Sequence, residues 1–164
     1  DGPRLALHHE DARPFLRKTD TRYDVISIDA YRQPYIPFYL STREFFELAR
    51  DRLAPGGVVV INIGHPEGQD EPEQVLSATI GAVFPNVVRY PYDETNTLVV
   101  AGDGPVSAER LRAAADLPAE LQPLAADAAD RIEPPLTGGE IYTDDDAPVE
   151  WLIDKSLLNY AGDS

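Results

Sequence analysis

Three groups of polar side chains follow apolar runs of the sequence, and together they could bind and deprotonate an amine. His9-Glu10-Asp11 follows the first run, Asp29 ends the second, and Asn62 to His65 end the third. In an open α/β sheet, ligands bind beyond the carboxyl ends of the strands, so adjacent strand ends would form one polar rim. A carboxylate on such a rim can accept a hydrogen bond from an amine or a hydroxyl, and it can act as a general base toward an amine.

The same polar residues could also have purely structural roles. Asp11 is placed to cap a helix, and Asp29 opens a loop, where aspartate is common because its side chain bonds to the turn backbone. Asn62 lies within an apolar run, and a buried amide needs hydrogen-bond partners, which favours a role on the rim. Tyr31 and the aromatic residues near it would line a pocket lid or would simply cover the sheet.

No metal site is expected. His8 and His9 are adjacent, so on a strand they would point to opposite faces. The triplet Asp144-Asp145-Asp146 lacks the glycine and the spacing of a calcium loop. The chain has no Cys, which excludes a Cys-ligated zinc, a thiolate nucleophile and a disulfide framework.

The charge balance limits the kinds of partner. The 164 residues include 29 acidic and 14 basic ones, a formal net charge of -15. Phosphate contacts need a surplus of Lys and Arg, so nucleic-acid binding is not expected and contact with an anionic membrane is disfavoured. No run approaches the roughly 20 apolar residues of a membrane span, and no signal peptide is visible. We therefore expect this segment in the cytoplasm, with a cationic small molecule as its partner.

Two hydrophobic periods alternate over residues 1–102 and predict the elements that position the rim. They predict strands at 4–9, 23–29, 58–63, 86–92 and 97–101, and helices at 11–18, 41–53 and 72–84. The loop inside the last strand pair is too short for a crossover helix, so this pair should be antiparallel. The order β-α-β-α-β-α-β-β predicts a doubly wound, mostly parallel sheet with helices on both faces and a C-terminal antiparallel hairpin.

Local signals predict where the second helix begins and ends. Ser41-Thr42-Arg43-Glu44 has the pattern of a capping box, with Ser41 as the cap. Ala54-Pro55-Gly56-Gly57 would end the helix after Leu53, since Gly supplies the left-handed residue and Pro cannot continue a helix.

The composition changes after Gly102. The remainder, 103–164, is acidic and rich in alanine, with helices expected at 107–115 and 117–132 and a last apolar stretch at 149–158. We therefore divide the chain into a Rossmann-like portion, 1–102, and an acidic helical extension.

Several motifs resemble the spermidine synthase (polyamine aminopropyltransferase) family over about residues 4–102. The segments that carry the resemblance are Glu10-Asp11-Ala12-Arg13-Pro14-Phe15-Leu16, Tyr23-Asp24-Val25-Ile26-Ser27-Ile28-Asp29-Ala30-Tyr31, Ile36-Pro37-x-Tyr39-Leu40-Ser41-Thr42-x-Glu44-Phe45-Phe46, Leu53-x-Pro55-Gly56-Gly57 and the strand that ends in Asn62. The resemblance implies an α/β fold, part of a class I methyltransferase-like sheet with a short helical tail. It also implies a transferase that uses decarboxylated S-adenosylmethionine, or S-adenosylmethionine, and no metal.

The resemblance also implies roles for single residues. Asp11-Ala12 matches the element whose Asp contacts the adenine amino group. Asp29 matches the carboxylate that orients and deprotonates the attacking amine. Asn62, Tyr31 and Tyr92 would contact the amine substrate. Because members of the family often form dimers or tetramers, a homo-oligomer fits the resemblance.

The chain departs from the family pattern at several positions. Arg32 stands where the family has its second Asp, which should repel a diamine, and Asn62 stands where the classical enzymes usually have Gln. The family's Tyr-Pro-Ser-Gly stretch before the last strand is replaced near Tyr92-Asp93-Glu94-Thr95. The Gly-rich cofactor turn belongs upstream of residue 1, and the chain opens with Asp1-Gly2-Pro3 and has no Met, so we expect a piece of a longer protein.

Two alternatives therefore stay open. One is an S-adenosylmethionine-dependent methyltransferase with another acceptor, for which Arg32 would fit a negatively charged group. The other is a family-like domain without catalytic activity that serves in assembly or ligand sensing.

Overall fold

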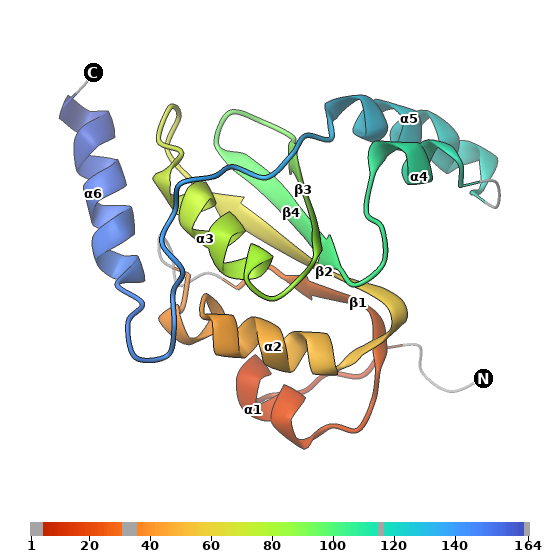
Figure 1. The fold of residues 1–164 in the computed structure, drawn as a ribbon, viewed down its shortest axis with the longest axis horizontal. Helices are drawn as coiled ribbons and strands as arrows, with labels where there is room; N and C mark the ends of the chain where they lie inside the picture. Colours follow the sequence, from red (N-terminus) through yellow and green to blue (C-terminus); the bar gives the residue numbers. More distant parts are fainter. Residues whose placement is uncertain (1–4, 31–35, 115–116, 163–164) are drawn as a thin grey trace.

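Helices and strands alternate through the first 102 residues, and helices alone make up most of the remainder (Figure 1). The computed structural model describes residues 5–30, 36–114 and 117–162. The strands are β1 (Tyr23–Ile28), β2 (Leu53–Gly64), β3 (Asn86–Pro91) and β4 (Asn96–Gly102). The helices are α1 (Ala12–Lys18), α2 (Arg43–Asp51), α3 (Glu71–Gly81), α4 (Ala108–Arg112), α5 (Gln122–Arg131) and α6 (Val149–Gly162), with short 3-10 turns at Phe38–Leu40 and Ala119–Leu121.

The four strands form one mixed sheet in the order β1-β2-β4-β3. β1 and β2 are parallel, whereas β4 is antiparallel to both β2 and β3. The antiparallel hairpin that the short loop predicts is confirmed. The prediction of a mostly parallel sheet is wrong for the described residues, because only one of their three strand pairs is parallel.

The strand predicted at 4–9 does not form in the described part of that segment. Residues 5–9 have no regular secondary structure, and Leu5 and Leu7 are 70% and 74% exposed. A strand is stable only where a neighbour satisfies its backbone, and no described strand pairs with the outer edge of β1. The described order therefore begins with α1, whose predicted cap is confirmed: Asp11 Oδ1 accepts the backbone N–H of Arg13 at 3.0 Å.

α1, α2 and α3 contact one another in succession and cover one face of the sheet (Figure 1). Alternate residues of β2 show which face is covered. Val59, Ile61 and Ile63 are at most 1% exposed, whereas Val58 and Val60, which alternate with them, are only half-buried. The other face of β2 is therefore only partly covered. An apolar run of β-branched residues can also form a strand that has one half-open face.

The helix predicted at 41–53 is shorter and has a different cap. Thr42, not Ser41, accepts the backbone N–H in the first turn of α2, at 3.3 Å. Leu53 already belongs to β2, which follows after a single residue. The positive φ of Gly56, 81°, lies in β2 and favours glycine there.

The chain after Gly102 returns across the helical layer. α4 and α5 pack together, with an ion pair of 2.6 Å between Arg112 and Asp130. From α5 the chain passes over α3 and ends in α6, which packs against α3 (Figure 1). Gly139 lies directly on α3, since a Cβ there would come within 2.2 Å of the Gln74 backbone. Among the described helices, none combines the length and the apolar character that a membrane crossing needs.

Candidate active site

Asp29 and Asn62 lie side by side at the carboxyl ends of β1 and β2. The two strands are parallel and pair Ile28 with Ile61, so the residues that follow emerge at the same edge of the sheet. The Nδ2 atom of Asn62 donates a hydrogen bond to Oδ1 of Asp29 at 3.2 Å. The structure thus brings together two of the residues that the sequence predicts for the site. The amide holds one oxygen of an otherwise exposed carboxylate.

Asp29 lines three open cavities. The Ala12 cavity, about 410 Å³, lies between α1, β1 and α2. The α6 cavity, about 830 Å³, reaches from Asp29 past His65 to the last helix. The tyrosine cavity, about 420 Å³, contains Tyr92, and Asn62 lines both the α6 and the tyrosine cavities. Groups bound in different cavities can therefore meet at this carboxylate.

The Ala12 cavity is walled mainly by apolar side chains. Ala12 and Phe15 come from α1, and Leu40 comes from the turn before α2. Asp11 is not among the lining residues, because its carboxylate caps α1 at the surface. Since residues 5–9 form no strand, Asp11 does not emerge from a strand end beside Asp29, and this part of the predicted rim is wrong.

The tyrosine cavity places two aromatic rings near Asp29. Tyr90 and Tyr92 stack with their ring centroids 6.4 Å apart, since residues two apart on a strand share a face. The guanidinium of Arg131, at the end of α5, lies 4.9 Å from the centroid of the Tyr90 ring and donates to its hydroxyl at 3.2 Å. The extension therefore fixes one of the two rings. Tyr31, the other tyrosine predicted for the substrate, lies outside the described residues.

A buried carboxylate lies behind the α6 cavity. Glu73 on α3 is 1% exposed, with one oxygen 3.1 Å from Nε of Arg89 and the other 3.9 Å from Nε2 of His65. The Nδ1 atom of His65 lies 3.1 Å from the carbonyl oxygen of Pro66. These contacts place the His65 ring at the cavity wall, beside a buried carboxylate. The described residues contain no group of three or more His, Cys, Asp or Glu side chains that could hold a metal.

The loop between β3 and β4 is ordered by its own aspartate. Asp93 Oδ1 accepts hydrogen bonds from the backbone N–H and the hydroxyl of Thr95, at 2.8 and 3.0 Å. The backbone N–H of Thr95 is the main cause of the lowered pKa of Asp93, so this carboxylate stays ionised. The loop in turn presents Thr95 and Asn96 to the α6 cavity.

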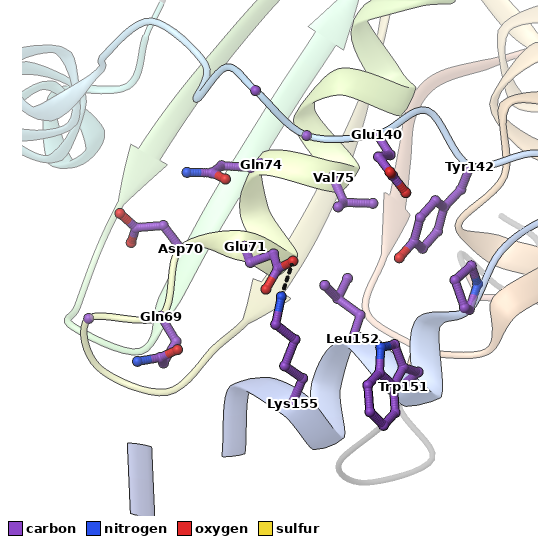
Figure 2. A pocket seen from close by; sticks show the side chains of 14 residues that line it. Gln69, Asp70, Glu71, Gln74, Val75, Glu140, Tyr142, Trp151, Leu152 and Lys155 are labelled. Atoms are coloured by element: carbon purple, nitrogen blue, oxygen red, sulfur yellow. Dashed lines mark hydrogen bonds and ion pairs between the residues drawn. The ribbon is translucent and has the colours of Figure 1, made fainter. Parts of the chain in front are cut away.

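A further cavity lies apart from Asp29, between the start of α3, the segment 138–142 and α6 (Figure 2). Its volume is about 640 Å³, and Lys155 of α6 forms an ion pair of 2.8 Å with Glu71 of α3 inside it. Burial, together with the charges of Glu140, Glu71 and Asp146, raises the pKa of Tyr142 to about 12. None of the residues predicted for the site lines this cavity.

Several residues that lie around Asp29 were not predicted from the sequence. Tyr90 could be found from the strand period, which places it on the same face as Tyr92. The last apolar stretch indicates a helix, but nothing in the sequence shows that it returns to Asp29 with the side chains Ile153, Leu157 and Tyr160. Glu73 has no local signal, because its partners come from other elements.

The fold and the site together define a class of protein. Asp29 lies beyond the carboxyl end of a parallel strand, which is where open α/β sheets bind their ligands. The profile described as "Spermine/spermidine synthase domain" matches residues 1–102. The chain belongs to this family.

Individual proteins agree with this assignment. The chain is 33% identical over 177 residues to the "Probable polyamine aminopropyl transferase" of Bifidobacterium longum, a match that covers 93% of this chain and 40% of that protein. It is 37% identical over 95 residues to "Polyamine aminopropyltransferase 2" of Pseudomonas aeruginosa, covering 55% of this chain and 27% of that one. The chain thus spans 40% or less of the length of these two relatives.

Solved structures share the fold. A probable spermidine synthase from Corynebacterium glutamicum superimposes with a TM-score of 0.57 at 21% identity, covering 88% of this chain and 57% of that one. Human Methyltransferase-like protein 13 superimposes with a TM-score of 0.55, also at 21% identity, covering 78% and 59% of the two chains. The family uses decarboxylated S-adenosylmethionine as its aminopropyl donor and acts on amine substrates.

Proposed function

We propose that the protein transfers an aminopropyl group from decarboxylated S-adenosylmethionine to an amine. The observation that carries this proposal is the position of Asp29, whose carboxylate is held by Asn62 and lines all three cavities. Alkylation of an amine needs a donor and an acceptor that meet at one base. A carboxylate shared by an apolar cavity and two more polar ones meets this need.

The Ala12 cavity fits the donor. Its apolar walls, from Ala12, Phe15 and Leu40, suit a flat aromatic base, and the carboxylate of Asp29 at its edge suits a cationic group. When bound, the donor supplies a sulfonium-activated carbon. Asp11 remains a predicted contact to the adenine amino group.

Asp29 has two tasks in the reaction. An alkylammonium cannot attack carbon until it loses a proton, and Asp29 would orient the nitrogen and accept that proton. As the nitrogen–carbon bond forms, the carbon–sulfur bond breaks and its electron pair stays on sulfur, which leaves as the neutral thioether methylthioadenosine. The proton then passes from Asp29 to water. Asn62 keeps the carboxylate in place, and Tyr92 contributes an aromatic wall for the substrate.

The test compares two donors and two aspartates. The full-length protein that carries residues 1–164 is incubated with an amine panel and either decarboxylated S-adenosylmethionine or S-adenosylmethionine, and products are measured by mass spectrometry. We expect aminopropylated amine only with the decarboxylated donor, and a fall of about 10²–10⁴-fold in rate for Asp29→Asn. Asp24→Asn is the matched control, because Asp24 is exposed on the same strand and lines none of the three cavities.

Two outcomes would contradict the proposal. Methyl transfer from S-adenosylmethionine, with no transfer from the decarboxylated donor, would indicate a methyltransferase. An Asp29→Asn variant as active as the unaltered protein would remove Asp29 from the reaction.

A further inference from the structure

The cavity of Figure 2, called the Lys155 cavity below, is separate from the candidate active site and carries an excess of negative charge. Its lining includes the carboxylates of Asp70, Glu71 and Glu140 and a single basic side chain, that of Lys155. Its volume, about 640 Å³, lies in the range of small-molecule sites. Because α3, the segment 138–142 and α6 all contribute to it, the carboxylates lie on more than one wall.

The hydroxyl of Tyr142 points into the Lys155 cavity without a partner. Tyr142 is 5% exposed, and Figure 2 shows its hydroxyl directed toward Leu152. No described group forms a hydrogen bond with this hydroxyl, although a buried tyrosine hydroxyl usually has a partner. Burial and the nearby carboxylates raise the pKa of Tyr142 to about 12, so the hydroxyl stays protonated at neutral pH. It can accept a hydrogen bond from the N–H of a bound ligand.

Lys155 shows that an alkylammonium group fits this cavity. Its Nζ atom lies 2.8 Å from Oε1 of Glu71, and Figure 2 shows the pair inside the cavity, close to Trp151. The side chains of the pair are 45% and 42% exposed, and such an ion pair is weak. The ammonium group of a ligand could therefore compete with Lys155 for Glu71.

Two further side chains favour a cation that is organic. Trp151 is 67% exposed at the cavity, and the face of an indole ring attracts cations and packs against alkyl chains. Glu140 has no ion-pair partner among the described residues. The carboxylates do not converge on one point, since the part of the chain that is described has no group of three that could hold a metal ion. A ligand with two separated ammonium groups fits this arrangement.

We propose that the Lys155 cavity binds an organic dication of the linear diamine type, with one ammonium group at Glu71 and the other at Glu140. The hydroxyl of Tyr142 and the indole ring of Trp151 would contact the ligand between these two ends. Binding at this second site goes beyond the proposed function and holds whether or not Asp29 is a catalytic base.

The test measures diamine binding by calorimetry in a low-salt buffer. The full-length protein that carries residues 1–164 is used with the substitution Asp29→Asn, which weakens amine binding at the candidate active site. The probes are hexamethylenediamine and hexylamine, which have the same length and differ by one ammonium group. We expect the diamine to bind about fivefold more tightly, and its affinity to fall as salt is added.

One pair of variants locates the binding. Glu140→Gln, made in the same Asp29→Asn protein, should weaken diamine binding by about fivefold. Glu150→Gln is the matched control, because Glu150 is also exposed and lies beside Trp151 but does not line the cavity. It removes the same charge and should change the affinity less than about twofold.

A third variant should improve binding, which misfolding cannot imitate. Lys155→Gln removes the ammonium group that competes for Glu71, so we expect the diamine to bind about fivefold more tightly. Three results would each overturn the inference. These are no diamine binding to the Asp29→Asn protein, equal effects of Glu140→Gln and Glu150→Gln, and a Lys155→Gln variant that binds no more tightly. Loss of aminopropyl transfer alone would contradict the proposed function and leave this site in place.

Discussion

Arg13 holds the carboxylate of Asp144 through two nitrogen–oxygen contacts, at 2.8 and 2.5 Å, although 131 positions separate the two residues. The hydroxyl of Thr42 donates to the same carboxylate at 2.7 Å, and Glu44 accepts the backbone N–H of Asp144 at 2.9 Å. One aspartate thus joins the starts of α1 and α2 to the segment that leads into α6. Because Arg13 follows Ala12, this contact also supports a wall of the cavity beside Asp29.

Removing the charge of Asp144 should destabilise the protein. In Asp144→Asn, the guanidinium of Arg13, which is 8% exposed, loses its counter-ion. Breaking a buried pair costs about 3–5 kcal/mol. Since the Asp144 side chain is 42% exposed and solvent screens it, we expect about 1–3 kcal/mol by urea unfolding. The control is Glu47→Gln, which breaks the exposed pair with Arg43 and should cost less than about 0.5 kcal/mol. Equal costs would contradict the prediction.

The carboxylate of Asp144 should also make the free energy of unfolding fall as the pH is lowered into the acid range. The hydrogen bond from Arg13, followed by that from Thr42, lowers the pKa of Asp144 below its ordinary value of 3.8. The unfolded state therefore takes up this proton first as the pH falls. The stabilisation is complete above the ordinary value and is lost as the pH falls through the lowered one. We expect the unfolding free energies of the unaltered protein and Asp144→Asn to converge in acid. A difference in unfolding free energy between the two proteins that stays constant down to about pH 2 would contradict this prediction.

Tyr142 should make the free energy of unfolding fall as the pH rises in the alkaline range. Its pKa is raised to about 12, chiefly by burial, so the folded state keeps a proton that the unfolded state loses at about 10. The stability due to Tyr142 is present below about pH 10 and is lost as the pH rises toward 12. Tyr142→Phe keeps the hydrogen bonds that the backbone of residue 142 makes to Arg43 and Thr79. It should remove the part of the alkaline loss of stability that is due to the phenol. Parallel alkaline unfolding curves for the two proteins would contradict the assignment.

Gly139 should tolerate no side chain. A Cβ at this position would come within 2.2 Å of the carbonyl group of Gln74, which is backbone and cannot move aside. We expect Gly139→Ala to cost about 2–3 kcal/mol in urea unfolding, because the segment before Tyr142 must leave α3. Gly104→Ala is the control, since nothing lies within 4 Å of its Cβ, and its effect should stay within about 0.5 kcal/mol. Equal effects would show that the segment does not pack on α3.

Local signals in the sequence predicted part of this fold correctly. Asp11 caps α1, and the short loop after β3 makes an antiparallel hairpin, because both features depend on a few neighbouring residues. The apolar runs that end in Asp29 and Asn62 predicted two strand ends at one edge, which the structure brings together.

Contacts between distant segments could not be predicted in this way. The strand expected at 4–9 lacks a described neighbour, and a strand pattern alone cannot supply one. The choice of Thr42 over Ser41 as the cap of α2 accompanies the bond from Thr42 to Asp144, which comes from the far end of the chain. The return of α6 to Asp29 likewise depends on packing against α3, which hydrophobic spacing within α6 does not encode.

Asn62 should act through Asp29 as a positioning residue. Its Nδ2 atom donates to Oδ1 of Asp29 at 3.2 Å, so its removal frees the carboxylate to turn away from the acceptor nitrogen. We expect Asn62→Leu, which keeps the approximate volume, to lower kcat for aminopropyl transfer by about 10–100-fold and to change KM much less. Asn62→Gln restores an amide and should recover most of kcat, whereas a purely structural role would give both variants the same loss of thermal stability. An Asn62→Leu variant with undiminished kcat would show that Asp29 needs no support from this side chain.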